Sequence, residues 1–301
     1  MADATDLAGH LEQAYGIRVG QLSALDRGVY RVDRPDGPAW VARVFPPERS
    51  LAAVEGDAAI LRGLERAGFP AERCTGDVST MDGNAVLVTE FVTGERASGR
   101  ARTYAILGAL LGRLHASPAD SVRAGGAWHH LCPQGGPDEE IAAVRTMLDE
   151  YGLAADHRLR STVEQMDDAA DLPHAFVHAD FVPANAIATA DDRLVIVDWA
   201  GSGRGPRIWS YGFLLWAAGA TDLRLVDWAA SRYRRHVELE PDELRRLPAA
   251  IGVRALTINC WRMRQGYATP AQVLAELPRD RALAQRIADR AVTAMAAPPD
   301  R

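Results

Sequence analysis

The stretch of sequence that decides the fold is His178-Ala-Asp180-Phe-Val-Pro-Ala-Asn185, which is followed by the apolar run Leu194-Val-Ile-Val197 and then by Asp198. It has the pattern H-x-D-x-x-x-x-N. Phosphoryl transfer requires such groups, because one carboxylate orients the hydroxyl that receives the phosphate, while an amide oxygen and a second carboxylate hold magnesium. The pattern therefore predicts Asp180 as the catalytic base or orienting group, and Asn185 and Asp198 as magnesium ligands.

The sequence around the motif supports this interpretation. Three apolar runs with the composition of short strands surround it, at residues 175–177, 186–189 and 194–197. The polar residues between the last two runs predict a hairpin that brings Asn185 and Asp198 close together. Both side chains offer hard oxygen atoms, which suit magnesium better than zinc. The alternative is that Asp180 and Asn185 only cap a loop and that Asp198 is an acid at a strand end.

The motif and its flanks resemble the aminoglycoside phosphotransferase and choline kinase-like family of small-molecule kinases. The family pattern is close to H-G-D-x-x-x-x-N followed by I-D-W, and Val197-Asp198-Trp199 is similar to this tail. The leucine-rich run from Leu107 to His115 resembles the helix that precedes the catalytic loop. The resemblance covers roughly residues 28–211 and is most specific at the catalytic loop. His178 is expected to brace this loop by hydrogen bonds, since no Ser or Cys partner for a nucleophilic role is evident.

The resemblance implies an α+β fold with the two lobes of a protein kinase. Residues 1–93 would form a small nucleotide-binding lobe built on a β-sheet. Residues 94–301 would form a larger, mainly helical lobe that carries the catalytic loop and binds the acceptor. The implied cofactors are ATP and magnesium, and the implied partner is a small molecule with a hydroxyl group.

The composition is that of a soluble globular protein, with 48% hydrophobic and 25% charged residues among 301. No apolar run has the length of a membrane span, and the first residues lack the features of a signal peptide. Cys74, Cys132 and Cys260 are isolated, which suggests neither a disulfide framework nor a zinc site. The net charge of −6 and the lack of a contiguous basic stripe argue against nucleic-acid binding. We expect a cytoplasmic protein without a membrane partner, and its oligomeric state stays open.

The chain contains no Lys, and all 34 of its basic residues are Arg. GC-rich coding is the simplest explanation, but the consequence is mechanistic. Kinases of this shape hold the α- and β-phosphates with a strand Lys that pairs with a helix acid. Strand-like runs at residues 28–32 and 39–45 flank the hairpin signal Asp36-Gly37. The resemblance places the Lys at Arg43, which is therefore expected to bind the phosphates.

A helix predicted over residues 50–67 carries the expected partner of Arg43. Its run Val54-Glu55-Gly56-Asp57 resembles the family's Val-Glu-x-Glu, so Asp57 takes the position of the pairing Glu, with Glu55 as the alternative. Arg is longer than Lys and Asp is shorter than Glu, so the pair spans a similar distance. The competing interpretation is that Arg43 reaches solvent from an edge strand and that Asp57 is a surface acid.

Two further nucleotide contacts follow from the resemblance alone. Arg27 and Gly28 lie between predicted strands, where the family covers the phosphates with a loop, although the usual G-x-G-x-x-G is absent. The β-run at residues 85–92 ends where the family has its hinge. Thr89 is therefore expected to offer its carbonyl, and Phe91 its amide, to the adenine. The alternative is a core strand that binds nothing.

Helices are also predicted over residues 103–115, 138–151 and 211–220, with a loop over residues 118–136. His115 is expected to pack or cap. Ser210 stands where the family has an Asp that ties down the catalytic loop, and Ala179 stands where Gly is usual. A Ser hydroxyl holds a loop less firmly than a carboxylate, because charge assistance is lost.

Charge says little about the acceptor. Residues 1–172 carry 26 acids and 17 Arg, a net of −9, and residues 173–301 carry 14 acids and 17 Arg, a net of +3. Acidic residues at 222 and 238–243 leave a cationic acceptor open. A set of basic and aromatic residues has two interpretations. Either the set faces an anionic or neutral acceptor, or its Arg residues form a solvated face and its aromatic residues belong to the core. The set consists of Arg254, Trp261, Arg262, Arg264 and Tyr267.

We therefore expect ATP- and magnesium-dependent phosphorylation of a small-molecule hydroxyl, first that of an antibiotic of the aminoglycoside type or another hydroxylated drug. A metabolite kinase that acts on a choline-like alcohol, a sugar or homoserine is the alternative. The missing Lys and Ser210 also motivate a catalytically silent ATP-binding pseudokinase. A helical interaction protein with an accidental motif is the remaining hypothesis.

Overall fold

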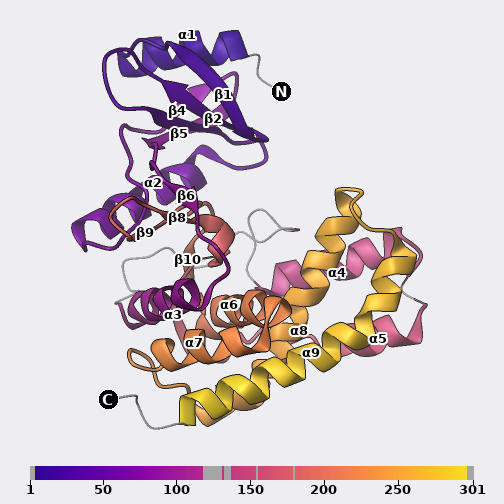
Figure 1. The fold of residues 1–301 in the computed structure, drawn as a ribbon. Helices are drawn as coiled ribbons and strands as arrows, with labels where there is room; N and C mark the ends of the chain where they lie inside the picture. The colour runs from indigo at the N-terminus through magenta and orange to yellow at the C-terminus, as the bar shows by residue number, and fades with distance from the viewer. Residues whose placement is uncertain (1–3, 118–130, 132–136, 154, 179, 297–301) are drawn as a thin grey trace. The chain divides into compact units, whose positions relative to one another are not determined.

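A computed structural model describes residues 4–117, 131, 137–153, 155–178 and 180–296. The chain forms two compact units, whose relative placement is not determined (Figure 1). The first contains residues 1–96 and 186–200, and the second contains residues 97–185 and 201–301. The hairpin that leads to Asp198 therefore folds with the N-terminal sheet. The assignment of nucleotide binding to residues 1–93 stays a prediction.

The first unit is built on a five-stranded antiparallel sheet with the order β1-β2-β3-β5-β4. The strands are β1 (Gln21–Asp26), β2 (Val29–Asp33), β3 (Trp40–Val44), β4 (Ser79–Met81) and β5 (Asn84–Glu90). Helix α1 (Ala4–Tyr15) covers one face, and helix α2 (Leu51–Arg66) lies on the opposite side (Figure 1). The predicted hairpin between β2 and β3 is confirmed by their antiparallel pairing.

Strand β3 divides its side chains between the two faces, because successive residues of a strand point in opposite directions. Trp40 and Ala42 join the apolar core that includes Leu7 and Leu11 of α1. Arg43 lies on the other face, where it and Asp57 of α2 line a cavity of about 10 Å³. This volume holds about one water molecule, so the groups around it are closely packed.

A second, three-stranded sheet in the first unit contains the hairpin that follows the H-x-D-x-x-x-x-N motif. Its order is β6 (Glu95–Arg96), β8 (Ala186–Ala188) and β9 (Leu194–Ile196), all antiparallel. The predicted hairpin of residues 186–197 is confirmed by the pairing of β8 with β9. The segment after α2 also pairs with β9, since the amide of Ile196 donates to the carbonyl of Pro70 at 2.8 Å.

The second unit is mainly helical. Its helices are α3 (Ala101–Ala116), α4 (Pro137–Glu150), α5 (His157–Glu164), α6 (Arg207–Thr221), α7 (Leu223–Tyr233), α8 (Pro241–Arg264) and α9 (Pro270–Ala296). A short antiparallel pair joins β7 (His174–Val177) to β10 (Gly203–Pro206). Two glycines let α3 approach α7 closely. A Cβ atom on Gly112 would lie 2.8 Å from the carbonyl oxygen of Tyr233, and one on Gly108 would overlap the backbone of Ala229.

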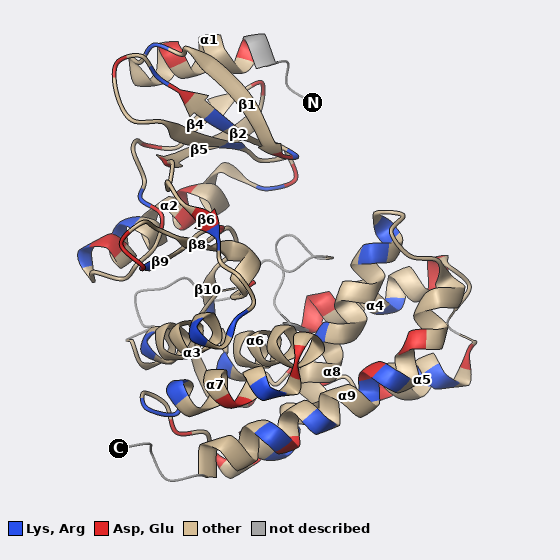
Figure 2. Cartoon of the chain, in the orientation of Figure 1, with Lys and Arg blue, Asp and Glu red and all other residues tan. Residues whose placement is uncertain are grey.

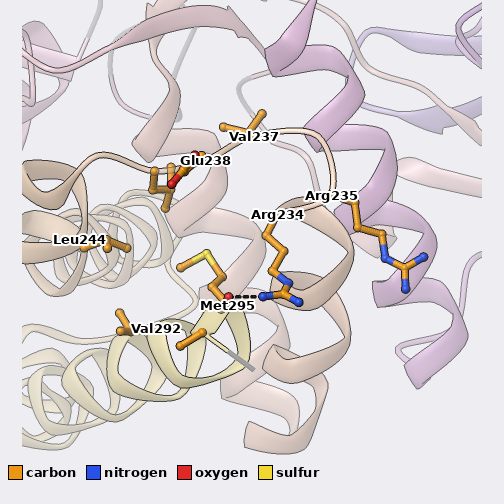
Figure 3. Close-up of a pocket in the computed structure, with 9 residues that line it drawn as sticks. Arg234, Arg235, Val237, Glu238, Leu244, Val292 and Met295 are labelled. Atoms are coloured by element: carbon orange, nitrogen blue, oxygen red, sulfur yellow. Dashed lines mark hydrogen bonds between the residues drawn. The ribbon is translucent and has the colours of Figure 1, made fainter. Parts of the chain in front are cut away.

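The described residues of the second unit line hollows of different size. One, of about 570 Å³, is lined by the segment between α7 and α8, by Leu244 of α8 and by the end of α9, and includes Arg234, Glu238 and Val292 (Figure 3). Another, of about 430 Å³, is lined by residues of α5, α8 and α9. None of the predicted site residues lines either hollow. Neither is therefore assigned to the chemistry of the motif.

The two-lobed α+β fold and most predicted elements are confirmed. Helices α2, α3, α4 and α6 correspond to the four predicted helical stretches within a few residues at their ends. The predicted loop over residues 118–136, with Cys132, lies outside the described residues apart from Leu131, and so does Ala179. Among the helices of the described residues, none combines the length and apolarity that a membrane crossing needs.

Candidate active site

The catalytic-loop motif lies in the second unit, between β7 and a short 3₁₀ turn at Pro183–Asn185. The side-chain amide of Asn185 donates to the carbonyl oxygen of Asp180 at 3.0 Å and to its Oδ2 at 2.8 Å. The amide of Asp180 in turn donates to Nδ1 of His178 at 3.0 Å. His178 is fully buried, and its ring meets Phe181 edge-on at 5.6 Å. The loop thus holds Asp180 from both sides, and His178 has the contacts that a bracing residue needs.

A buried guanidinium acts on Asp180 through its charge. Arg254 of α8 is completely buried, and its Cζ lies 3.6 Å from the ring centre of Phe213. Burial lowers the pKa of Arg254, and the negative charges of Asp180 and Glu140 oppose this shift. Glu140 is itself fully buried and accepts hydrogen bonds from the amide of Leu131. Arg254 therefore provides a positive charge near Asp180 and Glu140 inside the second unit.

Ser210 connects helices of the second unit through His115. Its Oγ lies 2.8 Å from Nε2 of His115, whose Nδ1 lies 2.8 Å from the hydroxyl of Tyr233. Burial, with a smaller contribution from the positive charge of Arg207, lowers the pKa of His115 to about 3. His115 is therefore a neutral, packed residue, as its sequence position predicted. The hydrogen bond of Ser210 goes to α3, whereas the Asp of the family would tie down the catalytic loop.

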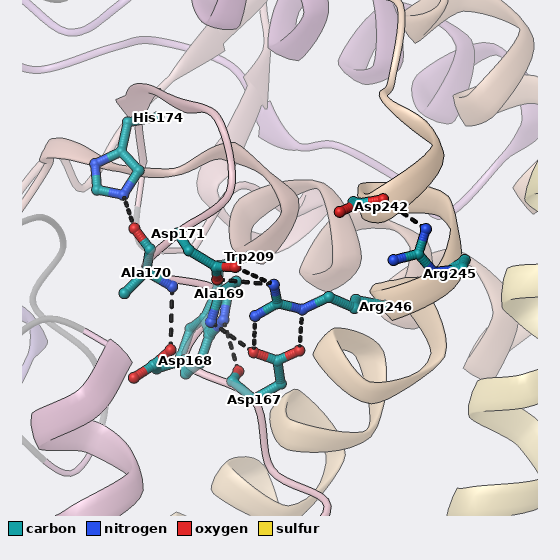
Figure 4. A network of polar contacts seen from close by, with 10 residues as sticks. All are labelled: Asp167, Asp168, Ala169, Ala170, Asp171, His174, Trp209, Asp242, Arg245 and Arg246. Atoms are coloured by element: carbon teal, nitrogen blue, oxygen red, sulfur yellow. Dashed lines mark hydrogen bonds and ion pairs between the residues drawn. The ribbon is translucent and has the colours of Figure 1, made fainter.

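The approach to β7 is anchored to α8. Arg246 binds both carboxylate oxygens of Asp167 and pairs with Asp171 at 2.7 Å, as Figure 4 shows. The indole of Trp209 donates to the carbonyl oxygen of Asp167 at 3.3 Å. Hydrogen bonding by Arg246 lowers the pKa of Asp167, so the pair stays charged at neutral pH. These contacts fix the segment that leads through β7 to Asp180.

Asp198, the other expected metal ligand, lies in the first unit directly after β9. Its φ angle of 67° is in the left-handed region, which Asp tolerates better than most residues. Its carboxylate forms an ion pair with Arg43 and is about 43% exposed, so it is accessible to a ligand. Trp199 is buried beside it, with its ring edge-on to Phe69 at 5.7 Å. The turn that carries Asp198 is thus packed on its neighbours.

Asp57 has a different partner from the one expected. Its carboxylate pairs with the guanidinium of Arg49 at 2.5 Å, and both side chains are buried. Arg43 pairs with Asp198 instead, and Asp57 acts on Arg43 only as a weaker charge. Glu55 is exposed on α2, so it offers no buried alternative. The expected Arg43–Asp57 ion pair is therefore corrected, because Arg49 precedes α2 closely enough to fold back onto Asp57.

Glu72 is a residue that the sequence did not single out. It is 6% exposed, and its Oε1 accepts a hydrogen bond from the amide of Asp198 at 2.8 Å. Its Oε2 accepts one from Oγ1 of Thr89 at 3.1 Å. Burial lowers the pKa of Arg43, but the charges of Asp198, Glu72 and Asp57 outweigh this and raise it above its usual value. Glu72 lies in a segment without a regular pattern, so the sequence offered no signal for its role.

The remaining nucleotide contacts lie in the first unit. Gly28 has a φ of 71°, and a Cβ there would lie 2.7 Å from the carbonyl oxygen of Val44. It forms with the exposed Arg27 a tight turn between β1 and β2. The amide of Phe91 donates to the carbonyl oxygen of Ala39 at 2.9 Å, so the sheet already uses the group that was expected to meet adenine. The side chain of Thr89 binds Glu72.

The basic residues of the set from Arg254 to Tyr267 have separate surroundings in the structure. Arg254 is buried, Arg262 pairs with Glu276 at 2.9 Å, and Arg264 donates to the carbonyl of Leu131 at 3.2 Å. The rings of Trp261 and Tyr267 lie 5.8 Å apart. Acidic and basic residues are also interspersed along α9 (Figure 2). These residues do not form one common anionic-ligand surface.

Comparison with known proteins agrees with this architecture. The profile of the phosphotransferase enzyme family (APH) matches residues 21–247. No curated protein matches the sequence. A solved structure of amicoumacin kinase hAmiN with AMP-PNP, Ca2+ and Ami is 17% identical, with 96% of this chain and 94% of that chain covered and a TM-score of 0.67.

Two further solved structures have the same fold. Choline kinase LicA from Streptococcus pneumoniae is 14% identical, with 93% of this chain and 98% of that chain covered and a TM-score of 0.63. The microcompartment-associated aminopropanol kinase is 16% identical, with 99% and 100% covered and a TM-score of 0.61. The predicted kinase-like fold is confirmed, and the chain belongs to the phosphotransferase enzyme family of small-molecule kinases.

Proposed function

We propose that this protein transfers the γ-phosphate of ATP, with magnesium, to a hydroxyl group of a small molecule. The observation that carries the proposal is the contact between Asn185 and Asp180. The amide nitrogen of Asn185 donates to Asp180 at 2.8 Å, which directs the nitrogen toward the base. The amide oxygen stays on the other side of the group, where it can serve as a metal ligand. One residue thereby orients the catalytic carboxylate and offers a hard oxygen.

The residues present fit a magnesium ion. Asn185 and Asp198 supply an amide and a carboxylate oxygen, and magnesium prefers one or two such protein ligands together with substrate phosphates and water. Among the described residues, no three His, Cys, Asp or Glu side chains form an all-protein metal cage. When bound, magnesium would screen the charge of the triphosphate. The amicoumacin kinase structure contains a nucleotide analogue and Ca2+, which supports nucleotide use in this fold.

Each protein group has a defined task in this proposal. Asp180 accepts a hydrogen bond from the acceptor hydroxyl and takes its proton as the hydroxyl oxygen bonds to the γ-phosphorus of ATP, while the bond from that phosphorus to the leaving oxygen of ADP breaks. His178 and Asn185 keep Asp180 in place. Arg43 binds phosphate oxygens, for which a planar guanidinium offers two donors. Arg27 and Gly28 lie in the turn that would cover the phosphates, and Asp57 keeps an indirect role through its charge on Arg43.

We infer that one backbone group of the hinge, and not the two of the family pattern, contacts the adenine. The carbonyl of Thr89 remains our proposed acceptor for the adenine edge. The amide of Phe91 would have to give up its bond to Ala39 before it could donate to adenine. The nucleotide role of residues 1–93, the acceptor role of residues 94–301 and a cytoplasmic location, where ATP is available, belong to the same proposal.

For the acceptor, we propose an antibiotic first and a metabolite alcohol second. Structures of similar fold include kinases named for amicoumacin and spectinomycin, and others named for choline and aminopropanol. The separate surroundings of the basic residues of α8 favour a neutral or cationic acceptor over an anionic one, since Arg262 is already paired with Glu276. A thermal-shift screen of hydroxylated antibiotics and alcohols, with nucleotide and magnesium present, tests this choice, because ligands raise apparent stability by mass action.

The screen has clear outcomes. A compound that raises the melting temperature and becomes phosphorylated identifies the acceptor class. Nucleotide binding without transfer to any bound compound supports the catalytically silent alternative. No stabilisation by millimolar magnesium ATP contradicts nucleotide binding and returns the chain to the helical interaction hypothesis.

A further inference from the structure

Glu72 connects three parts of the first unit at the place where Asp198 emerges from β9. Its amide donates to the carbonyl oxygen of Ile196 at 3.0 Å. Its carboxylate accepts one hydrogen bond from the amide of Asp198 at 2.8 Å and another from Thr89 at 3.1 Å. Both carboxylate oxygens are used, and the side chain is almost fully buried. Buried carboxylates with both oxygens bonded hold their surroundings in one arrangement.

The arrangement that Glu72 holds is an unusual one. Asp198 has a φ of 67°, which costs free energy for any residue with a Cβ and persists only where neighbouring contacts impose it. A carboxylate is a strong acceptor for a backbone amide. The bond from the amide of Asp198 to Glu72 therefore fixes the turn and, through it, the direction in which the Asp198 carboxylate points.

Glu72 also supplies charge to Arg43. Glu72, Arg43, Asp57 and Thr89 line the same small cavity. Asp57 is drawn to Arg49, so the acid of α2 that the family pattern would give to the strand cation is already engaged. After Asp198, Glu72 is the strongest negative influence on Arg43. A guanidinium reaches farther than an ammonium, which suits a partner that lies beyond α2.

We propose that Glu72 is a positioning residue of the nucleotide site, which fixes the main chain that carries Asp198 and places a carboxylate in the small cavity beside Arg43. It takes over the task that a helix acid performs for a strand Lys in related kinases, in a chain that has no Lys. With magnesium bound, the charge of Asp198 would be shared with the metal, and Glu72 would remain as a second carboxylate acting on Arg43. The inference rests on the proposed function of Arg43 and Asp198.

The experiment compares Glu72→Gln and Glu72→Ala with Glu65→Gln and the unchanged protein. Glu65 is a matched control, because it is a half-exposed acid of the same unit that pairs with Arg73 at 3.5 Å. Calorimetry measures the dissociation constant of ATP with magnesium and again with EDTA. The dissociation constant with EDTA divided by the one with magnesium is the ratio that reports the contribution of the metal. Thermal unfolding without ligands shows whether each variant is folded.

In Glu72→Ala the ratio should fall by about tenfold or more, as expected when a group that orients a metal ligand is removed. In Glu72→Gln it should fall less, because the amide keeps an oxygen for the Asp198 amide but loses the charge. Glu65→Gln should behave as the unchanged protein.

An unchanged ratio in Glu72→Gln, or in folded Glu72→Ala, overturns the inference and leaves the proposed function standing. If Glu72→Ala does not fold, Glu72→Gln decides alone. If the unchanged protein shows no magnesium-dependent ATP binding, the proposed function fails, and the role of Glu72 fails with it.

Discussion

The guanidinium of Arg43 is paired with the carboxylate of Asp198. The two groups are proposed to act on the same magnesium triphosphate, Arg43 on the phosphates and Asp198 on the metal. Their pairing keeps both side chains close to the positions of use. It also means that magnesium and Arg43 compete for one carboxylate, so the charge of Arg43 influences how much magnesium the site requires.

Replacement of Arg43 should separate these two effects. Arg43→Ala removes a charge-assisted hydrogen bond to phosphate, which is worth about 1.5–3 kcal/mol, and should weaken magnesium ATP binding by about tenfold or more. Arg43→Lys keeps the charge and should retain part of the affinity. Calorimetric titration with a non-hydrolysable ATP analogue measures both. Equal affinities for the two variants and the unchanged protein would show that Arg43 does not hold phosphate.

Arg254 is expected to matter for the stability of the second unit as well as for Asp180. Arg254→Met removes a fully buried charge and leaves the carboxylate of Glu140 without it, which should lower the free energy of unfolding by about 3–5 kcal/mol. Arg262→Met is the control, since the partly exposed pair with Glu276 is worth about 1 kcal/mol or less. Urea unfolding compares them. Equal losses in the two variants would contradict a special role for Arg254.

The contact of α3 with α7 depends on Gly108. Gly108→Val places side-chain atoms where the backbone of Ala229 lies, so it should destabilise the protein by about 3 kcal/mol or more through overpacking. At Gly252 of α8 a Cβ atom would have no neighbour within 4 Å, so Gly252→Ala should gain about 0.5–1 kcal/mol of helix stability. Thermal melting distinguishes them. A neutral Gly108→Val would show that the helices are farther apart than described.

His115 should make stability depend on pH. Its pKa is lowered to about 3 in the folded protein, from 6.5 when unfolded, so only the unfolded chain takes up a proton between these values. Stability is therefore constant above pH 6.5 and falls below it, by about 1 kcal/mol between roughly pH 7 and pH 5.5. His115→Gln should flatten this slope in urea titrations at both pH values. An unchanged slope in this variant would assign it to other groups.

The sequence predicted the local structure around the proposed site residues better than the contacts that hold these residues. The spacing of Asp180 and Asn185 reflects local geometry, so the loop could be recognised from it. The strand-like runs at residues 28–32 and 39–45 likewise predicted the hairpin of β2 and β3. These features depend on residues close together in the chain.

The missed contacts depend on segments that have no regular pattern. Arg49 reaches Asp57 from the loop before α2, and Glu72 reaches Asp198 across 126 residues of sequence. The substitution at Ser210 was visible, but its bond to His115 on α3 requires the packing of two helices. The use of the Phe91 amide by Ala39 depends on the register of β3 with β5. Only three-dimensional packing determines these choices.

The central claim is that Asp180 directs phosphate transfer from ATP to a hydroxyl. The most direct measurement is the rate of γ-phosphate transfer to the best acceptor from the ligand screen, for the unchanged protein, Asp180→Asn and the exposed-acid control Asp77→Asn. We predict a loss of about a hundredfold to ten-thousandfold in Asp180→Asn, with magnesium ATP affinity nearly unchanged, and full activity in Asp77→Asn. Full transfer activity in Asp180→Asn would contradict this claim.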